Sequence, residues 1–252
     1  MWTLDPNGSI PSWRHEGEPS ALRLAFSTRR GGVSAPPYDT LNLGRSSADR
    51  PDAVDENRRR WLTSLGLDPA CLATAGQVHG ARVVEVSGPG HAADCDALVT
   101  TTANLALAIS SADCLPILLA GEGVVAAVHA GWRGLAAGVS SAALRSLLAR
   151  GGEMRSVRAH FGPCIRDCCY HVGPEVARRF PAAAIRDRDG LSFLDLATAA
   201  RLELGEAGLA PDSIDDAGAC TACEPYWCFS HRRDRGATGR HWAVIALDAR
   251  GG

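Results

Sequence analysis

Two apolar arms on either side of a Gly-Glu-Gly turn at 121–123 most constrain the fold of this sequence. The arms, 115–120 and 124–128, carry no charge and contain many branched side chains, which is typical of buried strands. A short connection that contains glycine between two such arms predicts a β-hairpin. The second arm then runs into His129, Gly131, Trp132 and Arg133, so reactive side chains follow directly after a buried strand.

The remaining elements predict a layered fold around one core. Strands and helices alternate without a strict βαβ order, which favours α+β layering, a single domain with mixed β-sheets against flanking helices. A long Gly/Pro loop within 22–44 is of a kind that is usually functional. We expect a loose lead-in at 1–20 and one domain over 21–252. Strands are predicted within 22–44, 81–88, 105–110, 115–120, 124–128, 157–162 and 242–248, and helices over 51–67, 135–150, 173–180 and 193–209.

Composition excludes several classes of partner. With 252 residues, 46% hydrophobic and 21% charged, the chain is long enough to bury a sizeable core. A net charge of -2 provides no field to attract nucleic acid or an anionic membrane. The N-terminus has no signal-like pattern and no apolar run of membrane-spanning length, so a cytoplasmic protein is expected. An odd number of cysteines, nine, then argues for thiols or ligands rather than disulfides.

The hairpin brings together candidate metal ligands. A four-residue loop at 120–123 would place Cys114 directly opposite His129, with Cβ atoms roughly 5 Å apart. His79, in the segment GQVHGARV, is a third candidate. Two histidines and one cysteine suit zinc with a fourth position open, and they would also bind copper. The alternatives are a structural histidine at a strand end and a buried cysteine that acts as a small hydrophobe.

Arginine-bearing loops suggest an anionic or polyhydroxylated small ligand. Arg133 stands where a helix begins, and it either binds an anion such as phosphate or covers the Trp132 ring. Gly131 and Gly134 would let the backbone pass close to a ligand. Two further Arg/Gly loops occur at 27–34 and 229–239, for which solvated charge is the alternative.

Six other cysteines leave two interpretations open. CTACEPYWC and CIRDCC could hold a second, structural zinc ion, but paired C-x2-C units with a long spacer are absent. Reduced thiols in the core are therefore the default expectation for Cys164, Cys168, Cys169, Cys220, Cys223 and Cys228.

Eight segments together resemble one protein family over residues 27–240. They include QVHGARV, DCDALVT, SADCLPILL, VAAVHAGWRGLAAGV, GPCIRDCCYHVG and CFSHRRDRGATGR. The family is the one long described as laccase-domain or multicopper polyphenol oxidase and now as purine nucleoside phosphorylases with adenosine deaminase activity, with YfiH as a member. The resemblance implies a zinc-binding catalytic triplet of His79, Cys114 and His129. It also implies a pocket lined by Asn42, Arg58, Gln77, Asp113 and Arg133.

Three departures from the family pattern concern loops. His231 stands where the family usually has Tyr, His241-Trp242 replaces Met-Ala, and the segment after LNLG lacks the His-Val-Gly-Asp often found there. These changes bear on substrate preference rather than on the reaction.

Four functions follow as hypotheses. The leading one is phosphorolysis of adenosine, inosine, guanosine and 5′-methylthioadenosine, with adenosine deamination. The second is copper-dependent polyphenol oxidation, which would need a histidine-rich cluster that eight histidines without a His-x-His pair do not predict. The third is a cysteine hydrolase with a peptidoglycan-editing role, with Cys114 as nucleophile. The last is a non-enzymatic, metal-stapled binding domain. Purine nucleosides and phosphate are the expected partners, and protein partners are not predicted.

Overall fold

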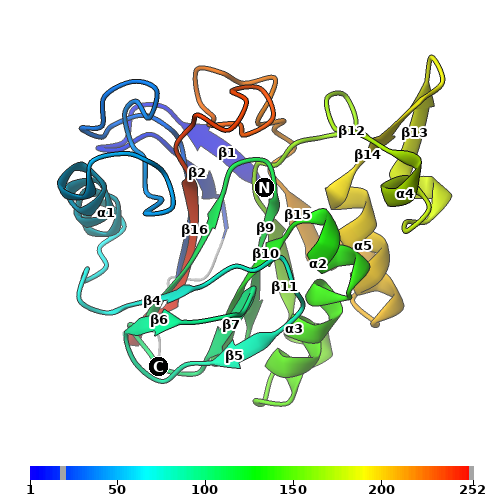
Figure 1. Ribbon diagram of the computed structural model, residues 1–252. Coiled ribbons are helices and arrows are strands. Elements are labelled where there is room, and N and C mark those ends of the chain that lie inside the picture. The colour runs from blue at the N-terminus through cyan, green and yellow to red at the C-terminus, as the bar shows by residue number, and fades with distance from the viewer. Residues whose placement is uncertain (18–20, 250–252) are drawn as a thin grey trace.

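Two β-sheets pack face to face at the centre of the computed structural model, which describes residues 1–17 and 21–249 (Figure 1). The first sheet has the order β1 (Trp2–Asp5), β2 (Ser12–His15), β3 (Leu22–Ser27), β16 (His241–Leu247), β8 (Ala106–Ser111), β4 (Leu72–Ala75) and β6 (Gly90–Ala92). The second has the order β15 (Ile214–Asp216), β11 (Arg158–Phe161), β9 (Leu115–Gly121), β10 (Val124–Ala130), β7 (Ala97–Thr100) and β5 (Val83–Glu85). A small third sheet joins β12 (His171–Val172), β14 (Leu191–Leu194) and β13 (Ile185–Arg188).

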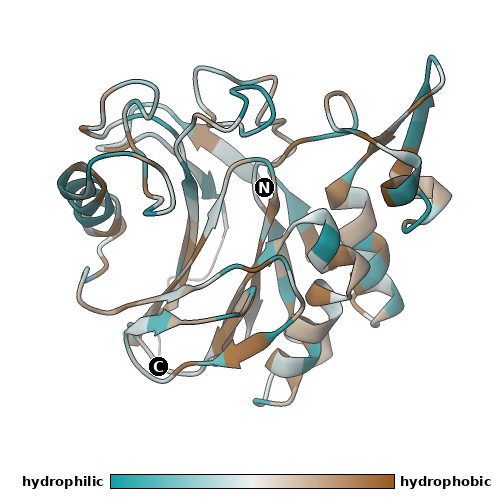
Figure 2. Ribbon diagram, viewed as in Figure 1, coloured by the Kyte–Doolittle hydropathy of each residue, from teal (hydrophilic) through white to brown (hydrophobic). Residues whose placement is uncertain are grey.

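Helices cover the outer face of each large sheet. On the first sheet lies α1 (Pro51–Ser64), and Figure 2 shows that much of its surface is hydrophilic. On the second lie α3 (Val139–Leu148) and α5 (Leu196–Glu206). The other helices are short: α2 (Trp132–Ala136), α4 (Pro174–Ala177) and 3-10 turns at Met154–Ser156, Ala182–Ala184 and Pro211–Ser213. The expected α+β fold with mixed sheets and flanking helices is confirmed.

Strand β16 shows why the layers form. Its side chains alternate between faces, so Ala243 and Ile245 join the cluster between the two sheets. Trp242, Val244 and Ala246 point the other way and pack with α1. Because both faces are apolar, the strand is stable only between two covered surfaces, and the sequence thereby dictates a four-layer arrangement.

The hairpin forms with a different register from the expected one. Gly121 pairs with Val124, so the connection is two residues long, and His129 lies opposite Pro116 rather than Cys114. Gly123 adopts φ 69°, which a residue with a side chain rarely does and which makes the tight connection possible. Because the register differs by two residues, each side chain keeps its face of the sheet. Cys114 and His129 therefore still converge.

Several elements differ from the predictions. The strands β4, β6, β7, β12, β13 and β15 lie where none was predicted. The helix expected over 193–209 begins only at Leu196, because β14 ends at Leu194 and the Asp195 side chain caps α5. The expected helix over 135–150 is two helices, because Gly138 at φ 81° interrupts it between α2 and α3. The prediction of a loose lead-in was wrong for residues 1–17. Strands β1 and β2 extend the first sheet there and bury Trp2 and Trp13 between the two sheets. Residues 18–20 lie outside the described part of the chain.

Within residues 1–17 and 21–249, none of the helices combines the length and the apolarity needed to cross a bilayer.

Buried His241 predicts a loss of stability in mild acid. Burial, aided by the charge of Arg29, lowers the pKa of His241 to about 3, and its Nε2 accepts a hydrogen bond from the Phe229 amide at 2.8 Å. The unfolded chain, with a histidine pKa near ~6.5, binds the proton first, so stability falls as pH falls from about 6.5 toward 3. This one group should cost about 2 kcal/mol at about pH 5.

The measurement is the free energy of unfolding in urea at about pH 7.5 and about pH 5. His241→Gln keeps an acceptor for Phe229 but does not titrate, so its decrease between the two pH values should be smaller by about 2 kcal/mol. Exposed His171→Gln is the matched control and should show the wild-type decrease. An H241Q protein with the wild-type decrease would contradict the assignment.

Candidate functional site

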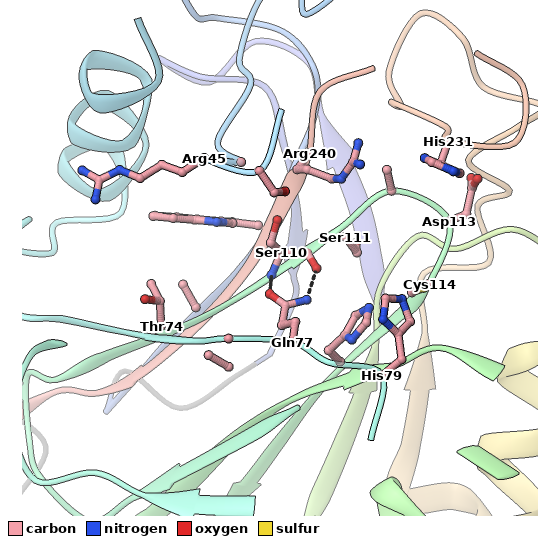
Figure 3. Close-up of a pocket in the computed structure, with 18 of the residues that line it drawn as sticks. Arg45, Thr74, Gln77, His79, Ser110, Ser111, Asp113, Cys114, His231 and Arg240 are labelled. Atoms are coloured by element: carbon pink, nitrogen blue, oxygen red, sulfur yellow. Dashed lines mark hydrogen bonds between the residues drawn. The ribbon is translucent and has the colours of Figure 1, made fainter. Parts of the chain in front are cut away.

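A pocket of about 850 Å³ opens between the α1 side of the first sheet and the ends of β9 and β10. This volume suits a small organic ligand. Figure 3 shows Arg45 and Thr74 toward one end and His79, Asp113, Cys114 and His231 toward the other, with Gln77 and Ser110 between them.

Three potential metal ligands meet at one end of this pocket. His79 comes from the loop after β4, Cys114 from the residue before β9, and His129 from β10. Their donor atoms all lie within 4.8 Å of one another, and the two imidazole centroids are 4.9 Å apart. A Cβ on Gly131 would stand 3.1 Å from both the Cys114 sulfur and the His79 ring, so the glycine leaves the room that this convergence needs.

The buried carboxylate of Asp96 holds two of these ligands. It accepts hydrogen bonds from three consecutive amides, those of Val78 at 3.1 Å, His79 at 2.9 Å and Gly80 at 2.7 Å. Its Oδ1 also lies 2.8 Å from Nδ1 of His129. A carboxylate only accepts, so Nδ1 is the donor and Nε2 of His129 is left to face the pocket. Burial alone would raise the pKa of Asp96. The hydrogen bonds outweigh this effect, so the pKa is lowered.

Backbone strain is concentrated at this site. Gln77, His79 and Asp113 adopt φ values of 53°, 63° and 88°, in the left-handed region that residues with side chains rarely occupy. Each such conformation costs about 1–3 kcal/mol and persists only where surrounding contacts impose it. The Asp96 carboxylate imposes it at His79, and the Gln77 side chain is fixed by donating to the Ser110 carbonyl at 2.6 Å and accepting from the Ser110 amide at 2.9 Å.

The end of the pocket where His79, Cys114 and His129 meet favours the thiolate form of Cys114. Burial alone would raise the pKa of Cys114, but the charge of His129 and hydrogen bonds from His129 and His79 lower it to about 6. Burial alone would lower the pKa of His129, but the Cys114 and Asp96 anions raise it to about 9. A ready thiolate and two imidazoles, one oriented by a carboxylate, form a donor set that fits zinc or copper with one position open to the pocket.

The pocket wall is strongly basic. The guanidinium of Arg58 lies 4.5 Å from the Trp242 ring centroid. Desolvation lowers the Arg58 pKa to about 10, so the group is still charged at neutral pH. Among the described lining residues Asp113 is the one carboxylate, against the guanidinium groups of Arg45, Arg58, Arg133, Arg232 and Arg240. Such a wall attracts an anionic ligand.

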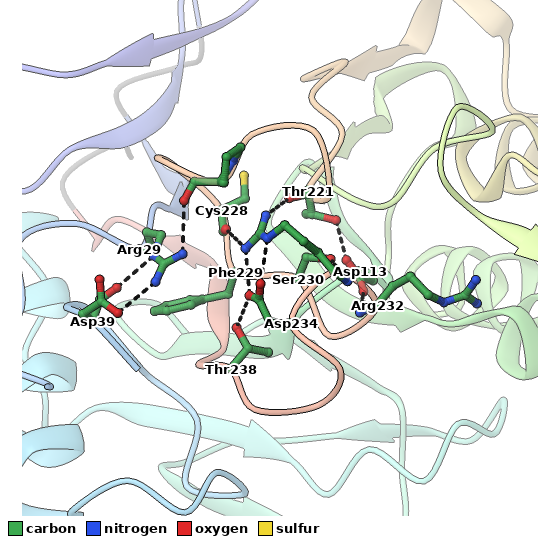
Figure 4. Close-up of polar contacts among 12 residues, drawn as sticks. Arg29, Asp39, Asp113, Thr221, Cys228, Phe229, Ser230, Arg232, Asp234 and Thr238 are labelled. Carbon is green, nitrogen blue, oxygen red and sulfur yellow. Dashed lines mark hydrogen bonds and ion pairs between the residues drawn. The ribbon is translucent and has the colours of Figure 1, made fainter. Parts of the chain in front are cut away.

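Asp113 is a structural anchor in this wall. Its Oδ1 accepts from the Thr221 hydroxyl at 2.6 Å and its Oδ2 from the Arg232 amide at 2.6 Å. Figure 4 shows how these contacts join the 221 and 232 segments to Asp113, the residue before Cys114 in the sequence. Both carboxylate oxygens are thus occupied by the protein.

Most of the predicted site residues lie at the pocket. His79, Cys114 and His129 come together, and the lining also contains Arg58, Gln77, Asp113 and Arg133. Asn42 does not line it: this buried side chain donates to Ser47 and Asp49 and accepts from the Gly44 and Arg240 amides, which shapes the loop beside the pocket. The Arg133 guanidinium covers the Trp132 ring, 4.5 Å from its centroid, and Arg133 also lines the pocket. Anion binding by Arg133 stays a prediction.

The other two Arg/Gly loops mainly use their arginines internally (Figure 4). Arg29 binds Asp39 and the Pro225 carbonyl. Arg233 forms a two-bonded pair with Asp234 and also donates to the Thr221 and Cys228 carbonyls. Arg232 is the exception and reaches the pocket.

Sequence reasoning missed several residues of the site. Asp96 could have been identified from the sequence, because it directly precedes the apolar strand 97–100, where a charge is costly unless it is paired. Tyr170, Ser110 and Arg240 line the pocket without a comparable signal. All three departures from the family pattern reach the lining, at His231, Trp242 and the Arg45-Ser46 segment. The expectation that they concern loops was wrong for His241-Trp242, which begins β16.

Comparisons with known proteins show the family and the fold of this chain. Residues 23–248 match the family model described as multi-copper polyphenol oxidoreductase laccase. The chain is 42% identical over 238 residues to a Deinococcus radiodurans protein named purine nucleoside phosphorylase, with 92% of each covered. It is 38% identical to the Escherichia coli protein named purine nucleoside phosphorylase YfiH, covering 94% of this chain and 98% of the relative. The solved structure of YlmD from Geobacillus stearothermophilus superposes with a TM-score of 0.91 at 32% identity, with 98% of each chain covered.

Neutralising Asp96 should weaken metal binding. Asp96→Asn replaces one oxygen by an amide that cannot accept from the loop N–H groups, so His79 and His129 lose their fixed orientation. Zinc affinity, measured by competition with a chromogenic chelator, should fall by about 10- to 100-fold. Exposed Asp94→Asn, two residues away, is the control and should bind as the wild type does. Wild-type affinity in D96N would refute the role of this carboxylate.

Proposed function

The chain belongs to the family of laccase-like multi-copper polyphenol oxidoreductases that its motifs indicated, and on this basis we propose that it is a zinc-dependent purine nucleoside phosphorylase with adenosine deaminase activity. Its substrates are adenosine, inosine, guanosine and 5′-methylthioadenosine. Its products are the free base and ribose 1-phosphate, or the 5-methylthioribose 1-phosphate from the last substrate. The relatives named purine nucleoside phosphorylase support this choice of reaction.

The observation that carries the proposal is the position of His79, Cys114 and His129 at one end of a basic pocket. These three side chains would hold the zinc ion. When bound, zinc supplies Lewis acidity, which activates water and stabilises developing negative charge.

In phosphorolysis, the arginines of the wall bind and orient inorganic phosphate. A phosphate oxygen attacks C1′ of the ribose while the bond from C1′ to the purine nitrogen breaks, and the base leaves with the bonding electrons. Fixed guanidinium groups favour this step because they neutralise phosphate without reorganisation during the reaction. Arg58, held by the Leu43 carbonyl at 2.8 Å and by the Trp242 ring, is preorganised in this way.

In deamination, water adds at C6 of the purine and ammonia leaves, so protons must move between the water, the ring and the leaving group. The imidazole of His231, which is not one of the three zinc ligands, lines the relevant end of the pocket and can pass a proton there. Asp113 is held in place by one hydrogen bond to each carboxylate oxygen, from Thr221 and Arg232.

A cysteine hydrolase with a peptidoglycan-editing role is the second candidate. The low Cys114 pKa beside a basic His129 is the arrangement of an activated thiolate and its imidazolium, and it favours this reading in the metal-free protein. Copper-dependent polyphenol oxidation has less support, because the other donor clusters among the described residues contain at most two histidines.

Turnover by metal-quantified protein tests the proposal. With adenosine and phosphate, we expect adenine and ribose 1-phosphate together with inosine; without phosphate, only inosine and its ammonia should form. Chelation or Cys114→Ala should abolish both reactions, with Cys71→Ser as the control that retains them. Unchanged nucleoside in all samples would reject the proposal, and a peptide-hydrolysing activity that survives chelation would favour the cysteine hydrolase.

Arg133 should affect phosphate use. Arg133→Lys retains the charge but loses the planar fork, so kcat/KM for phosphorolysis should fall about tenfold to hundredfold, or ~1.5–3 kcal/mol. The decrease should appear chiefly in the KM for phosphate. Exposed Arg145→Lys on α3 is the matched control. If R133K keeps the wild-type KM for phosphate, Arg133 only covers Trp132.

A further inference from the structure

Four cysteines gather on the far side of the loops that flank the pocket. Cys168, Cys169, Cys220 and Cys223 place their sulfur atoms all within 4.8 Å of one another. The Cys223 sulfur lies 3.6 Å from that of Cys168 and 3.4 Å from that of Cys169. None of these side chains belongs to the pocket lining.

Two segments far apart in sequence build this cluster from backbone contacts. The Thr221 amide donates to the Cys164 carbonyl at 3.0 Å, and the Cys164 amide to the Ala219 carbonyl at 3.3 Å. Each segment then turns and presents two thiols. The first turn is closed by the Cys169 amide on the Arg166 carbonyl at 2.9 Å, and the second by the Cys223 amide on the Cys220 carbonyl at 3.1 Å.

The four thiols differ in their exposure to solvent. Cys220 is buried, whereas Cys168 and Cys223 are exposed, so the cluster has a fixed inner ligand and an open outer side through which an ion can enter.

The spacing of the sulfurs matches one ion. A tetrahedral ion with metal–sulfur bonds of ~2.3 Å separates its ligand sulfurs by about 3.8 Å. The observed 3.4 Å and 3.6 Å separations are close to that value and much longer than the ~2.05 Å of a disulfide bond. Four thiolates with no water or histidine among them form a closed site, which is typical of structural rather than catalytic zinc.

We propose that Cys168, Cys169, Cys220 and Cys223 bind a second, structural zinc ion, separate from the pocket site. This ion ties the segment 164–170 to the segment 217–224. Both segments support the pocket, because Tyr170 lines it and Thr221 donates to Asp113. The second zinc therefore fixes a wall of the pocket that has little regular secondary structure of its own.

The test counts zinc in full-length protein purified under reducing conditions and dialysed against a weak chelator. The Cys114→Ala variant removes a pocket ligand, so the zinc that it retains reports the cysteine cluster alone. We expect one zinc per chain in C114A, one in the control C114A/C71S, and none in C114A/C168S/C223S. A folded C114A protein without zinc, or with iron in its place, would overturn the proposal, as would zinc retained by the triple variant.

Alkylation of the unsubstituted protein provides a second measurement that does not depend on how the variants fold. In the zinc-loaded protein, peptide mapping should find the four cluster cysteines protected from iodoacetamide, and removal of zinc should expose them. Full modification of Cys168 and Cys223 in the zinc-loaded protein would contradict the proposal, and so would a disulfide between them under reducing conditions. A failure of the nucleoside assay alone leaves this site unaffected, because neither measurement uses activity.

Discussion

The Asp96 carboxylate is the interaction on which the pocket depends. It is fully buried, so it is tolerable only because four donors surround it. Three of these donors belong to successive residues of one loop and the fourth to His129 on the neighbouring strand. One anion therefore sets both the unusual backbone of His79 and the ring orientation of His129. Two of the three candidate metal ligands, His79 and His129, are thus positioned by this charge as well as by their own segments.

The same principle holds in the surrounding loops, where charged or polar side chains replace regular backbone pairing. Asn57 donates to the Thr40 and Asn42 carbonyls and accepts from the Val33 amide. Arg233 and Asp234 bind each other while the guanidinium also bonds two carbonyls. Buried polar networks of this kind are rigid when every group is satisfied. The loops thus form a fixed pocket wall, and its arginines can contact a ligand with little reorganisation.

The features that the sequence could predict are those set by residues close together along the chain. The hairpin, α1 and β16 were predictable because their apolar patterns are local. The convergence of Cys114 and His129 was predictable because a two-residue error in hairpin register preserves the facing side chains. The hairpin pattern did not place His79 beside this pair, a position that the family resemblance implied. The strands within residues 1–17 were missed because Pro6, Gly8 and Pro11 occupy only their connection, while the buried Trp2 and Trp13 decide the pairing. Asn42 was assigned to the pocket, whereas its partners, Ser47 and Arg240, are set by tertiary contacts that no periodicity reports.

Departures from regular structure in this chain coincide with its chemistry. The sheets and helices follow their sequence patterns closely, yet Gln77, His79 and Asp113 adopt strained backbones and Asp96 is a buried charge. Each feature is unfavourable locally and is compensated by contacts that also define the pocket. Sequences that are consistent elsewhere break local rules mainly where function requires it. The residues with locally unfavourable conformations or buried charge are therefore those to which the pocket chemistry is assigned. The packed sheets supply the stability that offsets this local cost.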